Sequence, residues 1–113
     1  MAAEYVFTSL NALPGKEIAK GVTMRPLAGA HVMISCVDLS PDSTVALHSH
    51  PHEQLGVVLE GQIEMQIGEE RRALRPGDAY VIPGGTRHAA RASGGPARVL
   101  DVFYPLREEY LRG

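Results

Sequence analysis

The stretch VVLEGQIEMQIGEERRALRPGDAYVIPGG, residues 57–85, decides the fold class. Over residues 62–67, apolar and polar side chains alternate strictly, and this period of two predicts a half-buried β-strand. Gly61 precedes the strand, and Pro/Gly groups typical of turns follow at residues 75–78 and 83–85. Short apolar intervals between such turns predict an all-β sandwich or barrel rather than alternating strands and helices.

Short apolar stretches between turns also occupy the rest of the chain. We expect further strands over residues 30–39, 78–82 and 98–103, because these intervals are rich in Val, Ile, Leu and Tyr. Residues 105–112 could form one short C-terminal helix, with Pro105 at its first position. The fold class expected from this organisation is therefore all-β, with at most a short helix at the C-terminus.

The composition predicts one folded domain spanning residues 1–113. Apolar residues make up 44% of the chain and charged residues 21%, which excludes wholesale disorder. The net charge of −2 arises from 11 Lys and Arg against 13 Asp and Glu. Because there is no basic excess to neutralise phosphates, nucleic-acid binding is not expected. No apolar run approaches the roughly 20 residues that a membrane helix needs, so we expect no membrane partner.

The N-terminal residues and the single cysteine indicate the cellular compartment. Residues 1–4 lack the basic and apolar segments of a secretory signal. Cys36 is the single cysteine, which excludes an internal disulfide and fits a reducing environment. We therefore expect a cytoplasmic protein in which Cys36 is a small core residue rather than a ligand or nucleophile.

Three of the five histidines gather within residues 48–52. On a strand, His48 and His50 would project to the same side, about 6–7 Å apart, which suits two imidazoles meeting at one metal ion. A solvated histidine-rich turn is the alternative. His31 has no such companions and is expected to be an ordinary half-exposed strand histidine.

Two longer patterns include these histidines. Residues 48–61 read His-x-His-x3-Gln-x6-Gly, and residues 77–88 read Gly-x5-Pro-x-Gly-x2-His. In spacing and order they resemble the two signature motifs of the cupin superfamily, over residues 47–92. The resemblance implies a conical antiparallel β-barrel, a double-stranded β-helix related to the jelly roll.

The same resemblance implies a metal site. Carried over by position, the ligands are His48, His50 and Gln54 from the first motif and His88 from the second. They would hold one divalent transition metal ion, with Ni, Zn, Mn, Fe, Co and Cu all open because imidazole suits each of several metals. Four protein ligands would leave at least one coordination position for a substrate if the ion is five- or six-coordinate.

The chain departs from the usual motifs at two positions. Gln54 stands where Glu is more common, and Ala92 replaces a closing Asn. Neutral imidazoles and a neutral amide leave the charge of a divalent ion uncompensated, so the site should attract anionic substrates. Glu53 is a possible substitute ligand, although adjacent strand residues face opposite ways. His52 follows a proline, and we expect it at the surface or beside the ligands rather than among them.

The strand expected near the C-terminus carries an unusual acidic residue. By alternation, Asp101 and Phe103 share one face and would line a polar cavity. Leu100 and Val102 form the opposite, apolar face, expected to pack in the core or against a partner subunit. An Asp among apolar strand residues is unfavourable unless it is paired or functional. A plain salt bridge from Asp101 to an arginine, Arg98 or Arg107, is therefore an equal alternative to a catalytic role.

The tail of residues 101–107 reads Asp-Val-Phe-x-Pro-x-Arg and is followed by Glu-Glu-Tyr-Leu. It resembles the tail of a cupin subgroup that includes the pectin-degradation cupins, which convert unsaturated uronates into linear ketouronates. The resemblance implies that Asp101 moves a proton, Phe103 packs on the sugar and Arg107 holds the substrate carboxylate.

Three functions remain open at this point. The first is a lyase- or isomerase-type cupin that catalyses hydration, ring opening or isomerisation of a small oxygenated acid such as an unsaturated uronate. The second is a metal-dependent dioxygenase, since dioxygenase cupins share such ligand sets. The third is a non-catalytic small-molecule-binding cupin. Small cupins resemble one another in pairing sheets or exchanging N-terminal strands, which implies a homodimer with residues 5–7 as the candidate exchange segment.

Overall fold

The computed structural model describes residues 5–111, which form ten β-strands, one turn of 3-10 helix and one short α-helix. The absence of a signal segment was predicted from residues 1–4, which lie outside the described residues. The elements are, in chain order, η1 (Leu10–Ala12), β1 (Lys16–Ala19), β2 (Val22–Ala28), β3 (Met33–Leu39), β4 (Thr44–His48), β5 (Glu53–Glu60), β6 (Ile63–Ile67), β7 (Glu70–Leu74), β8 (Ala79–Ile82), β9 (His88–Ala92), β10 (Ala97–Tyr104) and α1 (Glu108–Leu111).

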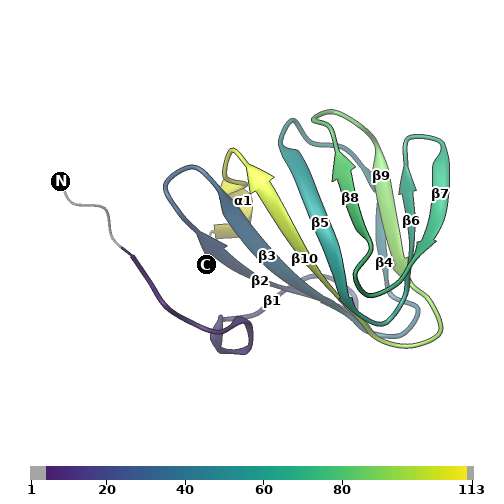
Figure 1. Cartoon of the computed structure of the whole chain (residues 1–113), viewed down its shortest axis with the longest axis horizontal. Coiled ribbons are helices and arrows are strands. Elements are labelled where there is room, and N and C mark those ends of the chain that lie inside the picture. Colours follow the sequence, from purple (N-terminus) through teal and green to yellow (C-terminus); the bar gives the residue numbers. More distant parts are fainter. Residues whose placement is uncertain (1–4, 112–113) are drawn as a thin grey trace.

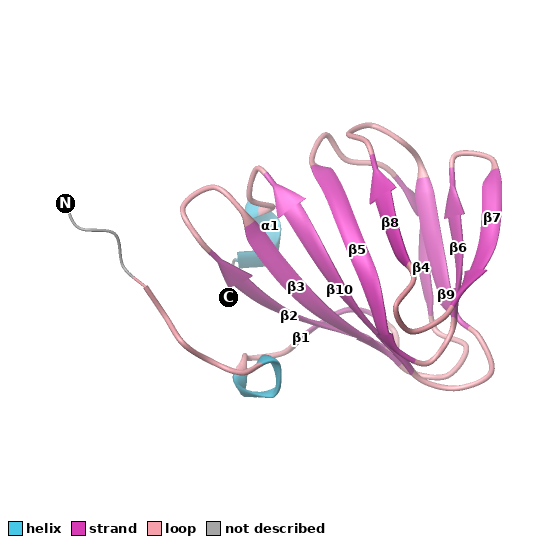
Figure 2. Cartoon of the chain, viewed as in Figure 1, coloured by secondary structure: helices cyan, strands magenta, loops and turns pink. Residues whose placement is uncertain are grey.

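The strands form two antiparallel sheets that face each other (Figures 1 and 2). The larger sheet has the order β1-β2-β3-β10-β5-β8, and the smaller has the order β4-β9-β6-β7. Strands far apart in sequence are therefore neighbours, as in jelly rolls. The expected all-β architecture is confirmed. Over residues 5–111, hydrogen bonding leaves two separate sheets rather than one closed barrel.

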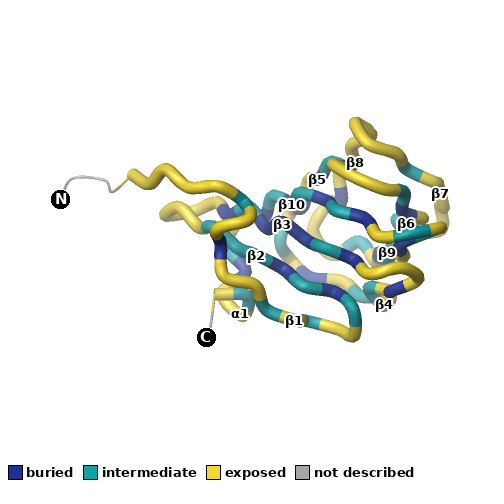
Figure 3. Tube along the Cα trace, turned by 90° about the horizontal axis from the view of Figure 1, so that it is seen from below, coloured by how far each residue is buried: buried dark blue, intermediate teal, exposed yellow. Residues whose placement is uncertain are grey.

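The strand β10 shows how alternation positions side chains (Figure 3). Its buried residues occupy every second position. They include Asp101 and Phe103, which lie on the inner face. Leu100 and Val102 are only half-buried on the outer face. Of the two alternatives expected for this face, packing in the core is therefore excluded, and packing against a partner subunit stays a prediction. The inner face of β10 lines the cavity between the two sheets.

Apolar side chains from both sheets fill the space around this cavity. Met24, Ile63 and Ile82 are fully buried, and each contributes about 1.5–3 kcal/mol through removal of its side chain from water. The apolar members of the same cluster are Val22, Met24, Val37, Leu39, Val58, Ile63, Met65, Ile82, Ala92, Ala97 and Val99. This packing provides a rigid support for the polar side chains of the site.

Local hydrogen bonds move some element boundaries from their expected positions. The strand expected from residue 30 begins at Met33, because residues 29–32 form a turn in which the Gly29 N–H donates to the Val32 carbonyl at 2.8 Å. His31 lies in this turn and is exposed, not half-exposed on a strand. The C-terminal helix starts at Glu108, so Pro105 is not its first residue. Cys36 is buried as expected.

The N-terminal segment of the described chain extends away from both sheets (Figure 1). Its side chains at residues 5–7 are strongly exposed, and none of these residues belongs to a strand. No helix within residues 5–111 has the length and apolar character required to cross a membrane.

Candidate functional site

Three histidines converge at one end of the space between the sheets. His48 ends β4 and His88 begins β9, and the two residues are direct partners across this antiparallel pair. Their ring centroids lie 4.3 Å apart, and the His50 ring lies 5.7 Å from that of His48 and 4.9 Å from that of His88. One ring nitrogen from each residue lies within 4.8 Å of the others, so this group could hold a metal ion.

The position of His50 arises from a loop rather than from strand alternation. β4 ends at His48, and residues 49–52 form a bend, so the expectation of one strand carrying both histidines is wrong. The Gly85 N–H donates to the His50 carbonyl at 2.8 Å and ties this bend to the loop after β8. A Cβ atom at Gly84 would overlap the Pro51 carbonyl oxygen, so glycine permits this close approach.

Backbone carbonyls orient all three imidazoles in the same way. The Nδ1 atom of His48 lies 2.7 Å from the Ala46 oxygen, and that of His88 lies 2.8 Å from the Thr86 oxygen. The Nδ1 atom of His50 lies 3.1 Å from the carbonyl of His52. Because a carbonyl can only accept, each Nδ1 must carry the proton, which leaves the Nε2 lone pair free. The buried Nε2 of His88 has no hydrogen-bond partner in the described structure, which suits a cation.

Gln54 of β5 brings an amide oxygen to the same place. Its Oε1 lies 3.0 Å from Nε2 of His50, and its side chain also hydrogen-bonds Asp101. The ionised carboxylate of Asp101 accepts from the amide N–H of Gln54, so the amide oxygen Oε1 points to the imidazole of His50. The Oε1 atom and the unprotonated Nε2 of His50 are both acceptors, and such a contact is unfavourable without a cation between them. Their spacing equals the ~3.0 Å that separates adjacent ligands with metal bonds of ~2.1 Å at right angles. The donor set therefore fits a transition metal ion.

The protonation state of the buried histidines also favours metal binding. Burial lowers the pKa of His50 to about 4, and the positive charge of Arg107 lowers it further, while the hydrogen bond with Gln54 opposes the shift. Burial likewise lowers the pKa of His88. Both rings are therefore neutral at pH 7, as a metal ligand must be.

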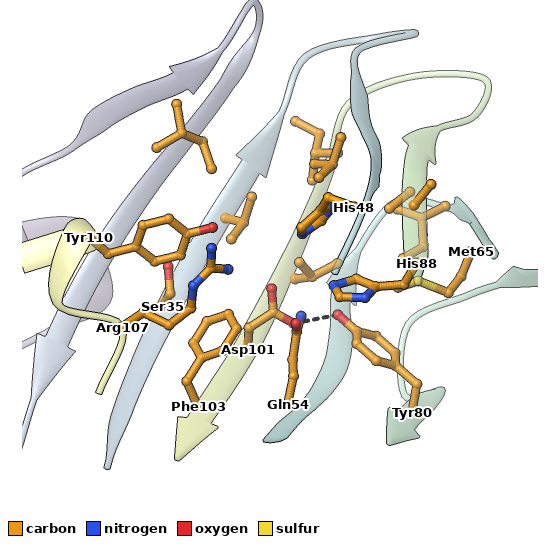
Figure 4. Close-up of a pocket in the computed structure, with 18 residues that line it drawn as sticks. Ser35, His48, Gln54, Met65, Tyr80, His88, Asp101, Phe103, Arg107 and Tyr110 are labelled. Carbon is orange, nitrogen blue, oxygen red and sulfur yellow. Dashed lines mark hydrogen bonds between the residues drawn. The ribbon is translucent and has the colours of Figure 1, made fainter. Parts of the chain in front are cut away.

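Asp101 lies beside this group on the inner face of β10 and is 7% exposed (Figure 4). Burial raises the pKa of its carboxyl group to about 6, although hydrogen bonds from Tyr80 and Gln54 and the charge of Arg107 oppose the shift. The Tyr80 hydroxyl donates to Oδ1 of Asp101 at 2.6 Å. A carboxyl group with this pKa can gain or lose a proton near neutral pH.

The expected plain salt bridge of Asp101 to an arginine is wrong. Arg98 faces outward and donates two hydrogen bonds to Asp38, at 2.6 and 3.1 Å. Nε of Arg107 pairs instead with Glu109 at 3.0 Å. The direct partners of the Asp101 carboxylate are therefore neutral donors, and Arg107 acts on it only through its charge.

Aromatic rings hold the Arg107 guanidinium in the cavity. Its central carbon lies 4.0 Å from the Tyr110 ring centroid and 5.1 Å from that of Phe103. Such cation–π contacts are attractive, and together with Glu109 they restrict the side chain. Figure 4 shows the guanidinium group on the same side of β10 as the Asp101 carboxylate. The fork of N–H donors is therefore available to an anionic group in the cavity.

The residues predicted from the sequence gather around one cavity between the sheets. With the exception of His50, which contacts the other histidine rings and Gln54, they all line it: His48, Gln54, His88, Asp101, Phe103 and Arg107. Glu53 is exposed. His52 stays outside the three-histidine group, and its carbonyl oxygen accepts from His50.

Sequence reasoning missed Tyr80, Ser35 and Tyr110, which also line the cavity. Tyr80 lies at an unspecified position of the second motif. The structure buries Tyr80 together with Ile82 on one face of β8, but residues 79–82 are all apolar or aromatic, so the sequence alone does not show which face points inward. No local pattern distinguishes Ser35 from other inward strand residues. The Tyr110 ring reaches the cavity because α1 folds back near β1 and brings this ring against Phe103 (Figure 3).

Comparisons with known proteins agree with the all-β fold. Residues 35–103 match the family model described as Cupin domain. The pectin degradation protein KdgF of Dickeya dadantii is 27% identical over 100 residues, covering 87% of this chain and 91% of that protein. The structure of KdgF from Halomonas sp. has a TM-score of 0.88 and 29% identity, covering 95% of this chain and 99% of that one. An RmlC-like cupin from Shewanella frigidimarina has a TM-score of 0.87 at 22% identity, covering 97% and 99%, and shows the fold alone.

Proposed function

The chain belongs to the cupin domain family, and we propose that it is a metal-dependent lyase- or isomerase-type enzyme. Its substrate is a small oxygenated acid such as an unsaturated uronate, which undergoes hydration, ring opening or isomerisation. The observation that carries this proposal is one cavity holding a metal-type donor set, a buried Asp101 and the cationic Arg107. The similarity to two KdgF proteins supports it. A single domain over residues 1–113 and a cytoplasmic location belong to the same proposal.

The imidazole Nε2 atoms of His48, His50 and His88 and the amide oxygen of Gln54 would hold one divalent transition metal ion. When bound, such an ion supplies a Lewis acid for hydroxyl or carbonyl oxygens. The four donors are neutral, so the cavity favours an anionic substrate. Gln54 has a second role, because its hydrogen bond to Asp101 keeps the carboxyl group beside the donor set.

The remaining side chains bind the acid and move a proton. Asp101 is the proton donor or acceptor, because its carboxyl pKa of about 6 allows both states near neutral pH. Arg107 binds the substrate carboxylate through N–H groups of its guanidinium fork. The Phe103 ring lies 5.7 Å from the ring of His50 and 5.1 Å from the guanidinium carbon of Arg107. It supplies an apolar surface for the sugar ring.

The direct test is a turnover assay with an unsaturated uronate. The purified protein should remove the ultraviolet absorbance of the substrate's conjugated double bond without consuming oxygen. Dialysis against a chelator should abolish the reaction, and a divalent transition metal salt should restore it. Oxygen consumption would support the dioxygenase alternative. Tight binding of the acid with no change in absorbance would leave only the non-catalytic binding function.

We also infer that the chain forms a homodimer through the outer face of the six-stranded sheet. Ile34, Val102, Leu55 and Val81 are successive cross-strand neighbours from β3 to β8, so they form one apolar row. Leu55 is 44% exposed and Val81 is 56% exposed. An apolar row of this kind on a sheet face favours burial against another surface. The exposed apolar side chains of residues 5–7 could extend the contact.

The dimer is tested by the mass in solution. Light scattering or sedimentation should give twice the 12.2 kDa of one chain, and Val81→Glu should shift the mass to that of a monomer. Glu64→Lys is the matched control, because it changes an exposed charge on the smaller sheet and should leave the dimer intact. A monomeric wild-type protein at micromolar concentration would contradict the inference.

A further inference from the structure

Tyr80 is a buried polar side chain to which the proposed reaction assigns no role. It lies on the inner face of β8 and is 8% exposed. In register, Tyr80 faces Gly56 of β5, and Gly56 faces Asp101 of β10. Tyr80 and Asp101 are therefore separated by one whole strand, and their side chains meet across it (Figure 4).

Gly56 makes this crossing possible. A Cβ atom at position 56 would overlap the Tyr80 ring carbon Cζ, its hydroxyl oxygen and Oδ1 of Asp101. All of these atoms occupy the space that a side chain of β5 would otherwise fill. A glycine inside a strand weakens the strand, so its presence suggests a site of close approach. Here the approach is that of a phenol to a carboxylate.

The phenol holds the carboxylate from one side, and Gln54 holds it from another. Tyr80 donates to Oδ1 at 2.6 Å, a short distance typical of a hydrogen bond to an ionised acceptor. Burial raises the pKa of Tyr80 strongly, and the negative charge of Asp101 raises it further, so the phenol stays protonated and remains a donor. With two fixed donors, the Asp101 side chain cannot rotate freely.

We propose that Tyr80 is a positioning residue for Asp101, and that Gly56 is required because it lets the phenol reach across β5. The bond to Oδ1 fixes the carboxyl group so that its remaining acceptor capacity faces the cavity beside Arg107. This inference rests on the proposed function, in which Asp101 transfers a proton to or from the bound acid. A misplacement of about 1 Å in such a group can lower the rate about 100-fold.

A merely structural hydrogen bond would have different consequences. If Tyr80 only satisfied a buried carboxylate, its loss would lower the unfolding temperature but would leave turnover unchanged well below that temperature. A positioning role requires that kcat falls while the substrate KM and the metal content stay the same. The two roles are therefore separated by the kinetic constants.

The experiment compares Tyr80→Phe with wild type and with Tyr104→Phe. Tyr104 is exposed on the outer side of β10, so the control makes the same chemical change away from the cavity. We expect Tyr80→Phe to lower kcat by about 10- to 100-fold, with KM and metal content within about twofold of wild type. In the metal-free protein it should lower the unfolding midpoint by about 4 °C. Tyr104→Phe should change none of these quantities.

The Asp101→Asn variant tests whether Tyr80→Phe lowers kcat by acting on Asp101. In protein that already carries Asp101→Asn, the Tyr80→Phe change should not lower the residual rate further. Unchanged kcat in Tyr80→Phe, or an equal loss in the Asp101→Asn background, would overturn the positioning role. Wild-type turnover is measured first. Its absence would overturn the proposed function and the positioning role together, whereas an active wild type with a fully active Tyr80→Phe variant would overturn the positioning role alone.

Discussion

Protein carrying His88→Ala should retain almost no metal while it keeps its fold. His88 provides a buried Nε2 atom that has no hydrogen-bond partner among residues 5–111, and its ring contacts those of His48 and His50. Changes to residues that merely support a ligand cost 10- to 100-fold in metal affinity, so removal of a ligand should weaken affinity by about 100-fold or more. Elemental analysis of protein purified without chelating resin measures the loss, and His50→Ala should behave in the same way.

The matched control for this experiment is His31→Ala. His31 is exposed in the turn before β3 and lies outside the three-histidine group, so its removal should leave the metal content unchanged. The apolar cluster between the sheets does not include His50 or His88, and circular dichroism should therefore show the same β-signal in all three variants. Full metal occupancy in both His50→Ala and His88→Ala would refute the metal centre.

The second large effect concerns Asp101. Asp101→Asn should lower kcat by about 100- to 10,000-fold, because the amide has nearly the same shape but cannot exchange a proton with the substrate. The amide oxygen can still accept the Tyr80 hydroxyl, so the fold should persist. The loss of ultraviolet absorbance from an unsaturated uronate provides the rate, and elemental analysis should show an unchanged metal content.

Asp42→Asn provides the comparison. Asp42 lies on the surface and pairs with the exposed Arg91 at 3.1 Å. Its φ is 64°, a conformation that Asn tolerates. This variant should turn over substrate at the wild-type rate, since an exposed ion pair contributes at most about 1 kcal/mol. Turnover by Asp101→Asn equal to that of Asp42→Asn would show that no proton passes through Asp101.

Much of the fold could be predicted from local patterns. The alternation of residues 62–67 indicated the strand observed at Ile63–Ile67, and the Pro/Gly groups indicated the turns around it. Several other strands carry weaker alternation and were not predicted, β2 and β9 among them. Their conformation depends on partners elsewhere in the chain, because a strand is stabilised by cross-strand neighbours as much as by its own residues.

The candidate site was also predicted only in part from the sequence. The spacing of His48, His50, Gln54 and His88 matched two motifs, and the structure places these four side chains together. The reason assigned to His50 was nevertheless wrong, since a bend tied to the Gly85 amide orients it rather than the pleat of a strand. Motif spacing therefore predicted that these side chains meet, but it did not predict the bend that brings His50 to the others.

Local patterns were enough to predict the fold class and the inward direction of Asp101, because side-chain periodicity is a property of consecutive residues. The groups that contact the Asp101 carboxylate could be identified only once the strands were paired. Register between β8, β5 and β10 brings Tyr80 to it across Gly56, and the outward face of β10 directs Arg98 to Asp38 instead. Strand pairing joins residues far apart in the chain, so no local pattern reports which side chains will meet.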